Sequence, residues 1–273
     1  MHLCLRFVLG ATLLLVIPVV AAAAGGSSIA AAPTVEPGVQ AFGNTASDQT
    51  RVSSCNNRAW LTEFWNLHLI AGDQVLLKGD ATAPAWGFHA WVFPAGTTDA
   101  TVDQRWGQTI SPGGRGGFDG APLVFTANVT GTYPVEFGGE CGVSAASGPF
   151  NFLVTVYHKA LVFLPPFSRI SSGGKFTAVV RTPDGSPISD PSLILRLYGV
   201  WKDASFVPAS RHLIGTAAAV RGLAQFTVRV PARLRGSTIQ LRVTGHGNGW
   251  QPVANSSATA VIAKGATEPV GRD

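Results

Sequence analysis

The arginines of the C-terminal half are the residues whose type and spacing most clearly favour a chemistry. Arg196 lies between Leu195 and Leu197, and Arg242 lies between two apolar neighbours in the same way. In a β-strand, such an arginine points away from the face that its apolar neighbours bury. A guanidinium group suits multivalent contact with phosphates, sulfates or carboxylates. We therefore expect an anion-binding face if the strands share one sheet, with these candidates: Arg181, Arg196, Arg229, Arg233, Arg235 and Arg242.

Charge divides the chain into two parts of opposite sign. Residues 25–157 carry five Lys or Arg against ten Asp or Glu, a balance of −5, whereas residues 158–273 carry fourteen against five, a balance of +9. The basic part favours an acidic partner, although an arginine face can also dock on the acidic part of the same chain or stay solvated. No recognised nucleic-acid-binding motif accompanies it, so the sequence predicts no dedicated nucleic-acid role.

No catalytic motif accompanies these arginines. The sequence contains no G-x-S-x-G elbow, no H-E-x-x-H pair, no phosphate-binding P-loop and no EF-hand loop. A triad is defined by geometry rather than by sequence order, so one assembled only in space stays open. The spacing itself predicts no enzyme and no cofactor. The histidines beyond residue 24 are scattered, at His68, His89, His158, His212 and His246.

Oxygen ligands for a metal ion are sparse. Asp99, Asp103 and Asp119 are the best candidates for a calcium site, which needs about six to eight oxygens. The alternative, which the sequence favours, is that they are solvated loop carboxylates, with Asp99 capping a turn. Asp73 and Asp184 each sit beside a glycine and fit turn positions.

Large aromatic residues concentrate in the first half of the chain. Trp86 and Trp106 flank loops and are the candidates for an exposed ring that stacks on a sugar or a protein partner. The segment 88–93 carries bulky side chains at both even and odd positions. One face of that strand must pack in a core, so the other is either covered by a loop, which we favour, or open as a stacking platform.

The N-terminus has the pattern of a secretory signal peptide over residues 1–24. Arg6 precedes an apolar run that ends in small residues, which predicts cleavage after Ala22 or Ala24. The alternative is a retained anchor, but the run is short for a membrane span and no later apolar stretch replaces it. Cys4 precedes the run, so a lipid-modified cysteine at the cleavage site is not expected. The sequence thus predicts export to the cell envelope or the exterior.

Two cysteines, Cys55 and Cys141, remain after the signal segment. In an exported chain an even pair predicts a disulfide, and the alternative is two buried free thiols. A bridge across so long a loop stabilises by about 4–5 kcal/mol at most in the chain-entropy account. No histidine lies at zinc-finger spacing from either cysteine, so no metal site is predicted there.

The elements that must position these residues are short strands. Only 13% of the chain is charged, while 32 Gly and 18 Pro punctuate it, which predicts an all-β fold of two antiparallel β-sandwiches of jelly-roll or immunoglobulin-like type. We expect a flexible leader over 25–50, a disulfide-linked sandwich over 51–157, a second sandwich over 158–265 and a tail over 266–273. Residues 58–69 also fit one face of a helix, so a helical turn before the strand stays open.

The first sandwich carries motifs of a known module. Ala71-Gly72-Asp73 follows an apolar strand, and Ala127-x-Val129-Thr130-Gly131-Thr132-Tyr133 follows another. With Trp91-Val92-Phe93-Pro94 between them, residues 60–157 resemble bacterial pre-peptidase C-terminal-type domains. That resemblance implies a β-sandwich appended to secreted enzymes or surface proteins and associated with secretion, targeting or substrate binding. The cysteine pair and the Gly-rich segment 112–117 depart from the family's general pattern.

The second sandwich resembles a bacterial immunoglobulin-like domain over about residues 160–263. The cues are the turn 182–188 after a strand, and the segment 221–228 leading to Val230-Pro231. Such domains serve as spacers, adhesins and binding modules, so the resemblance alone implies little about function.

Together these observations predict a non-catalytic, secreted or cell-envelope protein that binds or displays. Its basic second sandwich is expected to meet an anionic envelope polymer or a protein. The alternative is a carbohydrate- or substrate-targeting accessory module related to secreted hydrolases.

Overall fold

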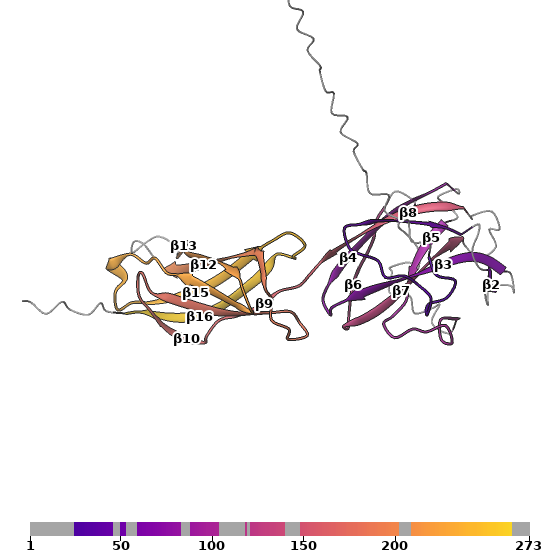
Figure 1. The fold of residues 1–273 in the computed structure, drawn as a ribbon. Coiled ribbons are helices and arrows are strands. Elements are labelled where there is room, and N and C mark those ends of the chain that lie inside the picture. Colours follow the sequence, from indigo (N-terminus) through magenta and orange to yellow (C-terminus); the bar gives the residue numbers. More distant parts are fainter. Residues whose placement is uncertain are drawn as a thin grey trace, which may run out of the picture.

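The fold is built almost wholly from β-strands, which confirms the predicted all-β class (Figure 1). A computed structural model describes residues 25–45, 50–52, 59–82, 88–103, 118, 121–139, 148–201 and 209–263. The described residues include a short 3-10 turn, η4 (Ala232–Leu234). No helix long and apolar enough to cross a membrane occurs among the described residues.

The first sandwich consists of two four-stranded sheets, and the strands paired within each sheet run antiparallel. One sheet has the order β1-β8-β4-β6 and the other β2-β3-β7-β5. Their strands are β1 (Gln40–Asn44), β2 (Thr50–Val52), β3 (Ala59–Leu69), β4 (Gln74–Ala81), β5 (Phe88–Val92), β6 (Leu123–Thr126), β7 (Gly131–Gly139) and β8 (Pro149–Tyr157).

Strict alternation of apolar residues builds the core of this sandwich. Along β8, Phe150, Phe152 and Val154 are buried, while the residues between them are half-buried or exposed. β3 runs as one strand from Ala59 to Leu69, so the helical turn left open for this segment does not form. Tyr133 is fully buried, and its hydroxyl donates to the carbonyl of Val129 at 2.7 Å, which fixes the turn before β7.

Residues 25–45 of the expected leader form backbone hydrogen bonds with the first sandwich. The leader lies along β3, where the N–H of Gly26 donates to Phe64 O at 2.9 Å and the N–H of Val35 donates to Asn66 O at 2.9 Å. Ile29 buries its side chain in a small cluster with Phe64, Trp91, Phe93 and Val102. Few of its side chains are buried, so the segment lacks a periodic pattern, and its backbone hydrogen bonds supply the order instead. The second bulky face of β5 is therefore covered.

The second sandwich packs a five-stranded sheet of order β10-β16-β15-β12-β13 on a three-stranded sheet of order β14-β11-β9. The short β10 runs parallel to β16, and the other pairings are antiparallel. Its strands are β9 (Leu161–Phe163), β10 (Phe167–Ile170), β11 (Lys175–Arg181), β12 (Asp190–Trp201), β13 (Ser210–Ala219), β14 (Leu223–Thr227), β15 (Thr238–His246) and β16 (Val253–Ile262).

Alternation again separates core from surface. Leu193, Leu195 and Leu197 are fully buried, and Arg196 between them is exposed. A two-residue turn joins β13 to β14, with Arg221 at φ 51° and Gly222 at φ 76°. Positive φ at both central positions is the geometry that matches the right-handed twist of a hairpin.

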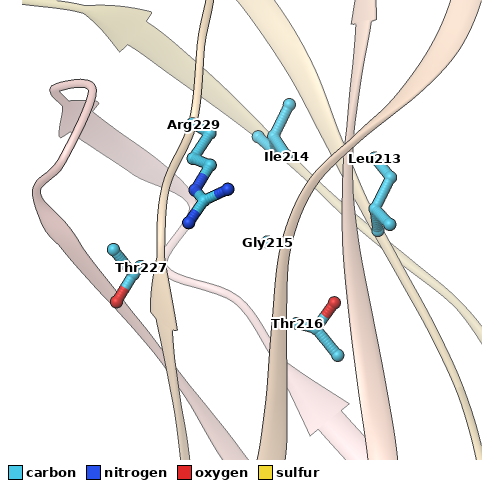
Figure 2. Close-up of a pocket in the computed structure, with 6 residues that line it drawn as sticks. All are labelled: Leu213, Ile214, Gly215, Thr216, Thr227 and Arg229. Atoms are coloured by element: carbon cyan, nitrogen blue, oxygen red, sulfur yellow. The ribbon is translucent and has the colours of Figure 1, made fainter.

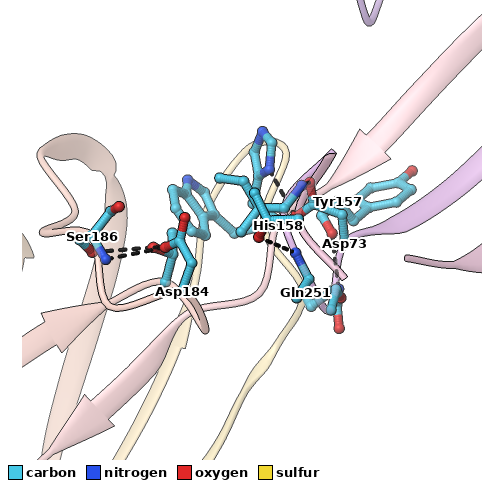
Figure 3. Close-up of polar contacts among 12 residues, drawn as sticks. Asp73, Tyr157, His158, Asp184, Ser186 and Gln251 are labelled. Atoms are coloured by element: carbon cyan, nitrogen blue, oxygen red, sulfur yellow. Dashed lines mark hydrogen bonds and ion pairs between the residues drawn. The ribbon is translucent and has the colours of Figure 1, made fainter. Parts of the chain in front are cut away.

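The two sandwiches meet where β8 ends. His158 follows β8, and its Nδ1 lies 3.0 Å from Oδ1 of the buried Asp73. Asp73 also holds its own turn, as the sequence indicates, because Oδ2 accepts the N–H of Ile70 at 2.9 Å. The side-chain amide of Gln251 donates to Gly72 O at 2.7 Å and to Tyr157 O at 2.8 Å. Figure 3 shows these contacts gathered around the connection.

Several predictions fall on residues outside the described ranges. These are the signal segment 1–24, the cysteine pair Cys55 and Cys141, and the residues 264–273. The disulfide and the signal peptide therefore stay predictions.

Candidate basic binding face

Four arginines point outward from the five-stranded sheet of the second sandwich. Arg196 on β12 and Arg242 on β15 come from the predicted set, and Arg169 on β10 and Arg211 on β13 join them. On β10, β12 and β15, each of these arginines has a buried neighbour in sequence whose side chain points to the opposite face. On β13, a register irregularity interrupts this alternation. We name the set Arg169, Arg196, Arg211 and Arg242, with Tyr198, the arginine face.

Tyr198 lies at the centre of the arginine face. Tyr198 on β12 is the cross-strand partner of Arg242 on β15, and Arg196 lies two residues before Tyr198 on β12. Neighbouring strands lie about 4.8 Å apart and same-face residues of one strand about 6.7 Å apart, so Arg196 and Arg242 are direct same-face neighbours of Tyr198. The Cζ of Arg211 lies 3.8 Å from the ring centroid of Tyr198, a cation–π contact that orients the guanidinium.

The electrostatics of the face are those of a positive surface. Hydrogen bonding and charge from Arg211 lower the pKa of the Tyr198 hydroxyl from its usual 10.0, and charge from Arg196 acts in the same direction. Among the described residues, the second sandwich has two carboxylates, Asp184 and Asp190, and both are engaged by loop residues and by Trp250 rather than by the arginine face. The charge of the face is thus uncompensated within the described chain.

The other predicted arginines are placed elsewhere. Arg181 lies on β11 of the three-stranded sheet and donates to Gly185 O at 2.7 Å, which ties it to its own turn. Arg233 lies within η4, and Arg235 directly follows it. Arg235 also lines a small cavity of about 200 Å³ together with Ser171 and Ser172. Arg229 follows β14 and lines a cavity of about 380 Å³ at the margin of the arginine face (Figure 2).

The remaining site predictions are only in part within the described residues. Both carboxylate oxygens of Asp99 accept backbone N–H groups, from Ile29 at 2.7 Å and from Ala30 at 3.1 Å, so Asp99 anchors the leader. Asp103 is exposed at the end of the same loop. Asp119, Trp86 and Trp106 lie outside the described residues. No group of three or more His, Cys, Asp or Glu able to hold a metal ion occurs in the part that the structure describes.

The histidines occupy separate structural positions. His68 contacts the hydroxyl of Thr132 at 2.7 Å. His89 is buried against Trp91, and His212 stacks on Trp201 with ring centroids 4.1 Å apart. His158 pairs with a carboxylate, as described above, and its ring lies 5.5 Å from that of Trp250.

Sequence reasoning missed two members of the face. Arg169 lies in the four-residue strand β10, too short to show alternation. Arg211 is separated from the apolar pattern of β13 by a register irregularity opposite Leu197 and Tyr198. An irregularity of this kind breaks the period of two, so Arg211 could have been found only by allowing a bulge between Arg211 and Gly215.

No protein-family model matches the sequence, and no curated protein matches it either. Among solved structures, the chain is similar to the adhesin domain of Epf from Streptococcus pyogenes, at 10% identity and a TM-score of 0.38, over 84% of this chain and 78% of that one. It is also similar to three N-terminal domains of the outer capsid protein Hoc of bacteriophage RB49, at 12% identity and a TM-score of 0.32, over 76% and 72% of the two chains. These values carry no argument about function.

Proposed function

We propose that this protein is a non-catalytic binding protein of the cell envelope or exterior, which holds an anionic polymer on the arginine face. The observation that carries the proposal is the grouping of three outward arginines, Arg196, Arg211 and Arg242, around Tyr198, with Arg169 farther away on the same sheet and no carboxylate of the described second sandwich engaged with them. Arginine binds phosphate, sulfate and carboxylate groups with paired N–H donors. A polymer presents such groups at intervals and can contact several guanidinium groups at once.

Export is part of the proposal and rests on the signal-like residues 1–24. The resemblances to pre-peptidase C-terminal-type and bacterial immunoglobulin-like domains agree with a binding or display role, and they stay predictions.

Binding of purified protein to heparin, polygalacturonate, polyphosphate and neutral dextran across a salt series tests the proposal. We expect salt-sensitive binding to at least one polyanion, which Arg196→Gln weakens by about fivefold, a loss of about 1 kcal/mol. Lys78→Gln is the matched control, because Lys78 is an exposed cation on β4 of the first sandwich. Equal weakening by both variants would assign the binding to net charge alone and refute a defined face.

A second candidate function rests on the outer face of the β1-β8-β4-β6 sheet. Phe42 is 49% exposed and Tyr157 37% exposed on this face, and the side-chain amide of Gln40 donates to Asn151 Oδ1 at 2.9 Å between them. Aromatic rings and amides on a sheet suit a neutral sugar chain. Salt-insensitive retention on neutral polysaccharide, lost in Tyr157→Ala, would favour this targeting role over the arginine face.

A further inference from the structure

A cavity lies at the seam where β13 meets the segment after β14. It has a volume of about 380 Å³, and Figure 2 shows Arg229 and Thr227 on one side and Leu213, Gly215 and Thr216 on the other. The N–H of Arg229 donates to the carbonyl of Ile214 at 2.8 Å, which closes the floor. This volume is near the lower end of the about 300–1,000 Å³ of small-molecule sites, so the cavity suits a ligand unit of one sugar or one amino acid.

Gly215 lets the two sides approach closely enough to form this floor. A Cβ at this position would lie 3.1 Å from Cβ of Phe226 and 3.3 Å from the carbonyl oxygen of Thr227. Phe226 and Thr227 both belong to β14, so a larger residue at position 215 would push β13 and β14 apart. The floor of the cavity is thus built by close packing of backbone.

The polar groups of the cavity favour an anion. The guanidinium of Arg229 is exposed and makes no hydrogen bond or ion pair within the part of the chain that the structure describes. The hydroxyl oxygen of Thr227 accepts a hydrogen bond from Lys175 Nζ at 3.1 Å, so its own hydrogen is left to donate toward a ligand. Two cations therefore act on the cavity, and none of the described residues that line it is a carboxylate.

The shape of these groups favours a carboxylate on a compact body. A single planar guanidinium matches a carboxylate with two parallel N–H donors. Leu213 is 55% exposed at the rim and supplies an apolar surface for the ring or chain that carries the acid.

The cavity is continuous with the arginine face. Thr216 is the strand partner of Arg196, and Leu213 is the strand partner of Tyr198. We infer that the cavity receives one carboxylate-bearing unit, such as a hexuronate, of the anionic polymer that the arginine face holds. This inference rests on the proposed function and assigns to Arg229 the recognition of a single acidic unit.

Titration of purified protein with glucuronate, monitored through the amide NMR signals of residues 213–216 and 227–229, tests the inference, with glucose and inorganic phosphate as comparison probes. We expect saturable glucuronate binding at millimolar concentration and no response to glucose. Arg229→Gln should weaken glucuronate binding by about tenfold or more, since it removes a charge-assisted contact. Lys78→Gln should leave it unchanged, because Lys78 is an exposed cation on β4 of the first sandwich and does not line the cavity.

Two results would overturn the inference. One is tighter binding of phosphate than of glucuronate, and the other is equal glucuronate affinity of the Arg229→Gln variant and the unaltered protein. Retention on polyanion columns separates the two proposals. If the protein binds polyanions but shows no shift with glucuronate, the cavity assignment fails and the arginine face stands. If polyanion binding is absent, the proposed function fails, and the glucuronate titration still reports on the cavity alone.

Discussion

The contact between His158 and Asp73 predicts that the connection between the sandwiches strengthens in mild acid. Asp73 is 1% exposed and His158 40% exposed, with the two atoms 3.0 Å apart. The hydrogen bond to Asp73 raises the pKa of His158 above its usual 6.5, and charge from Asp73 and Asp190 adds to this, while burial opposes it. Because the folded-state pKa exceeds the unfolded value, the stabilisation is fully present below about pH 6.5 and is lost as pH rises through the folded pKa.

The magnitude follows from the type of bond and its exposure. A hydrogen bond to a charged group contributes about 1.5–3 kcal/mol when well shielded. The exposed side of His158 is screened by water, so about 1 kcal/mol is expected here. In a chain of this size that free energy corresponds to a shift of about 2–4 °C in the thermal midpoint.

The variant His158→Asn isolates the titration. Its amide nitrogen can donate near the position of Nδ1, but it carries no charge, so a neutral hydrogen bond survives. Thermal unfolding of both proteins at pH 5.5 and pH 8.5, with an NMR titration of the His158 ring, measures the effect. The thermal midpoint of the unaltered protein should exceed that of the variant at pH 5.5. This difference should be larger by about 2–4 °C than the difference at pH 8.5. An equal difference at both pH values, or a His158 midpoint at or below 6.5, would refute the reasoning.

Two further substitutions test the local structure. Arg221→Asn should stabilise the protein by about 0.5–1 kcal/mol in chemical denaturation, because Arg221 holds a positive φ of 51° that asparagine tolerates better; a destabilised variant would contradict this. Asp99→Ala should release the leader, since it removes the acceptor for the N–H groups of Ile29 and Ala30; amide exchange over residues 26–35 should then accelerate, and unchanged protection would show that the burial of Ile29 suffices.

The sequence by itself determined the class of fold and the direction of most strand side chains. Alternation has a period of two and is a local property, so it can be counted without knowing which strands are neighbours. That count placed Leu195 and Leu197 in the core and Arg196 and Arg242 outside it, as the structure has them.

Only the tertiary structure decided which side chains share a surface. Strand order separates Arg181, on the three-stranded sheet, from Arg196 and Arg242, and it brings Arg211 to Tyr198 across a register irregularity. The leader, the junction at His158 and the cavity beside Arg229 depend on contacts between residues far apart in the chain. Such contacts are selected by the packing of whole sheets, which no local period encodes.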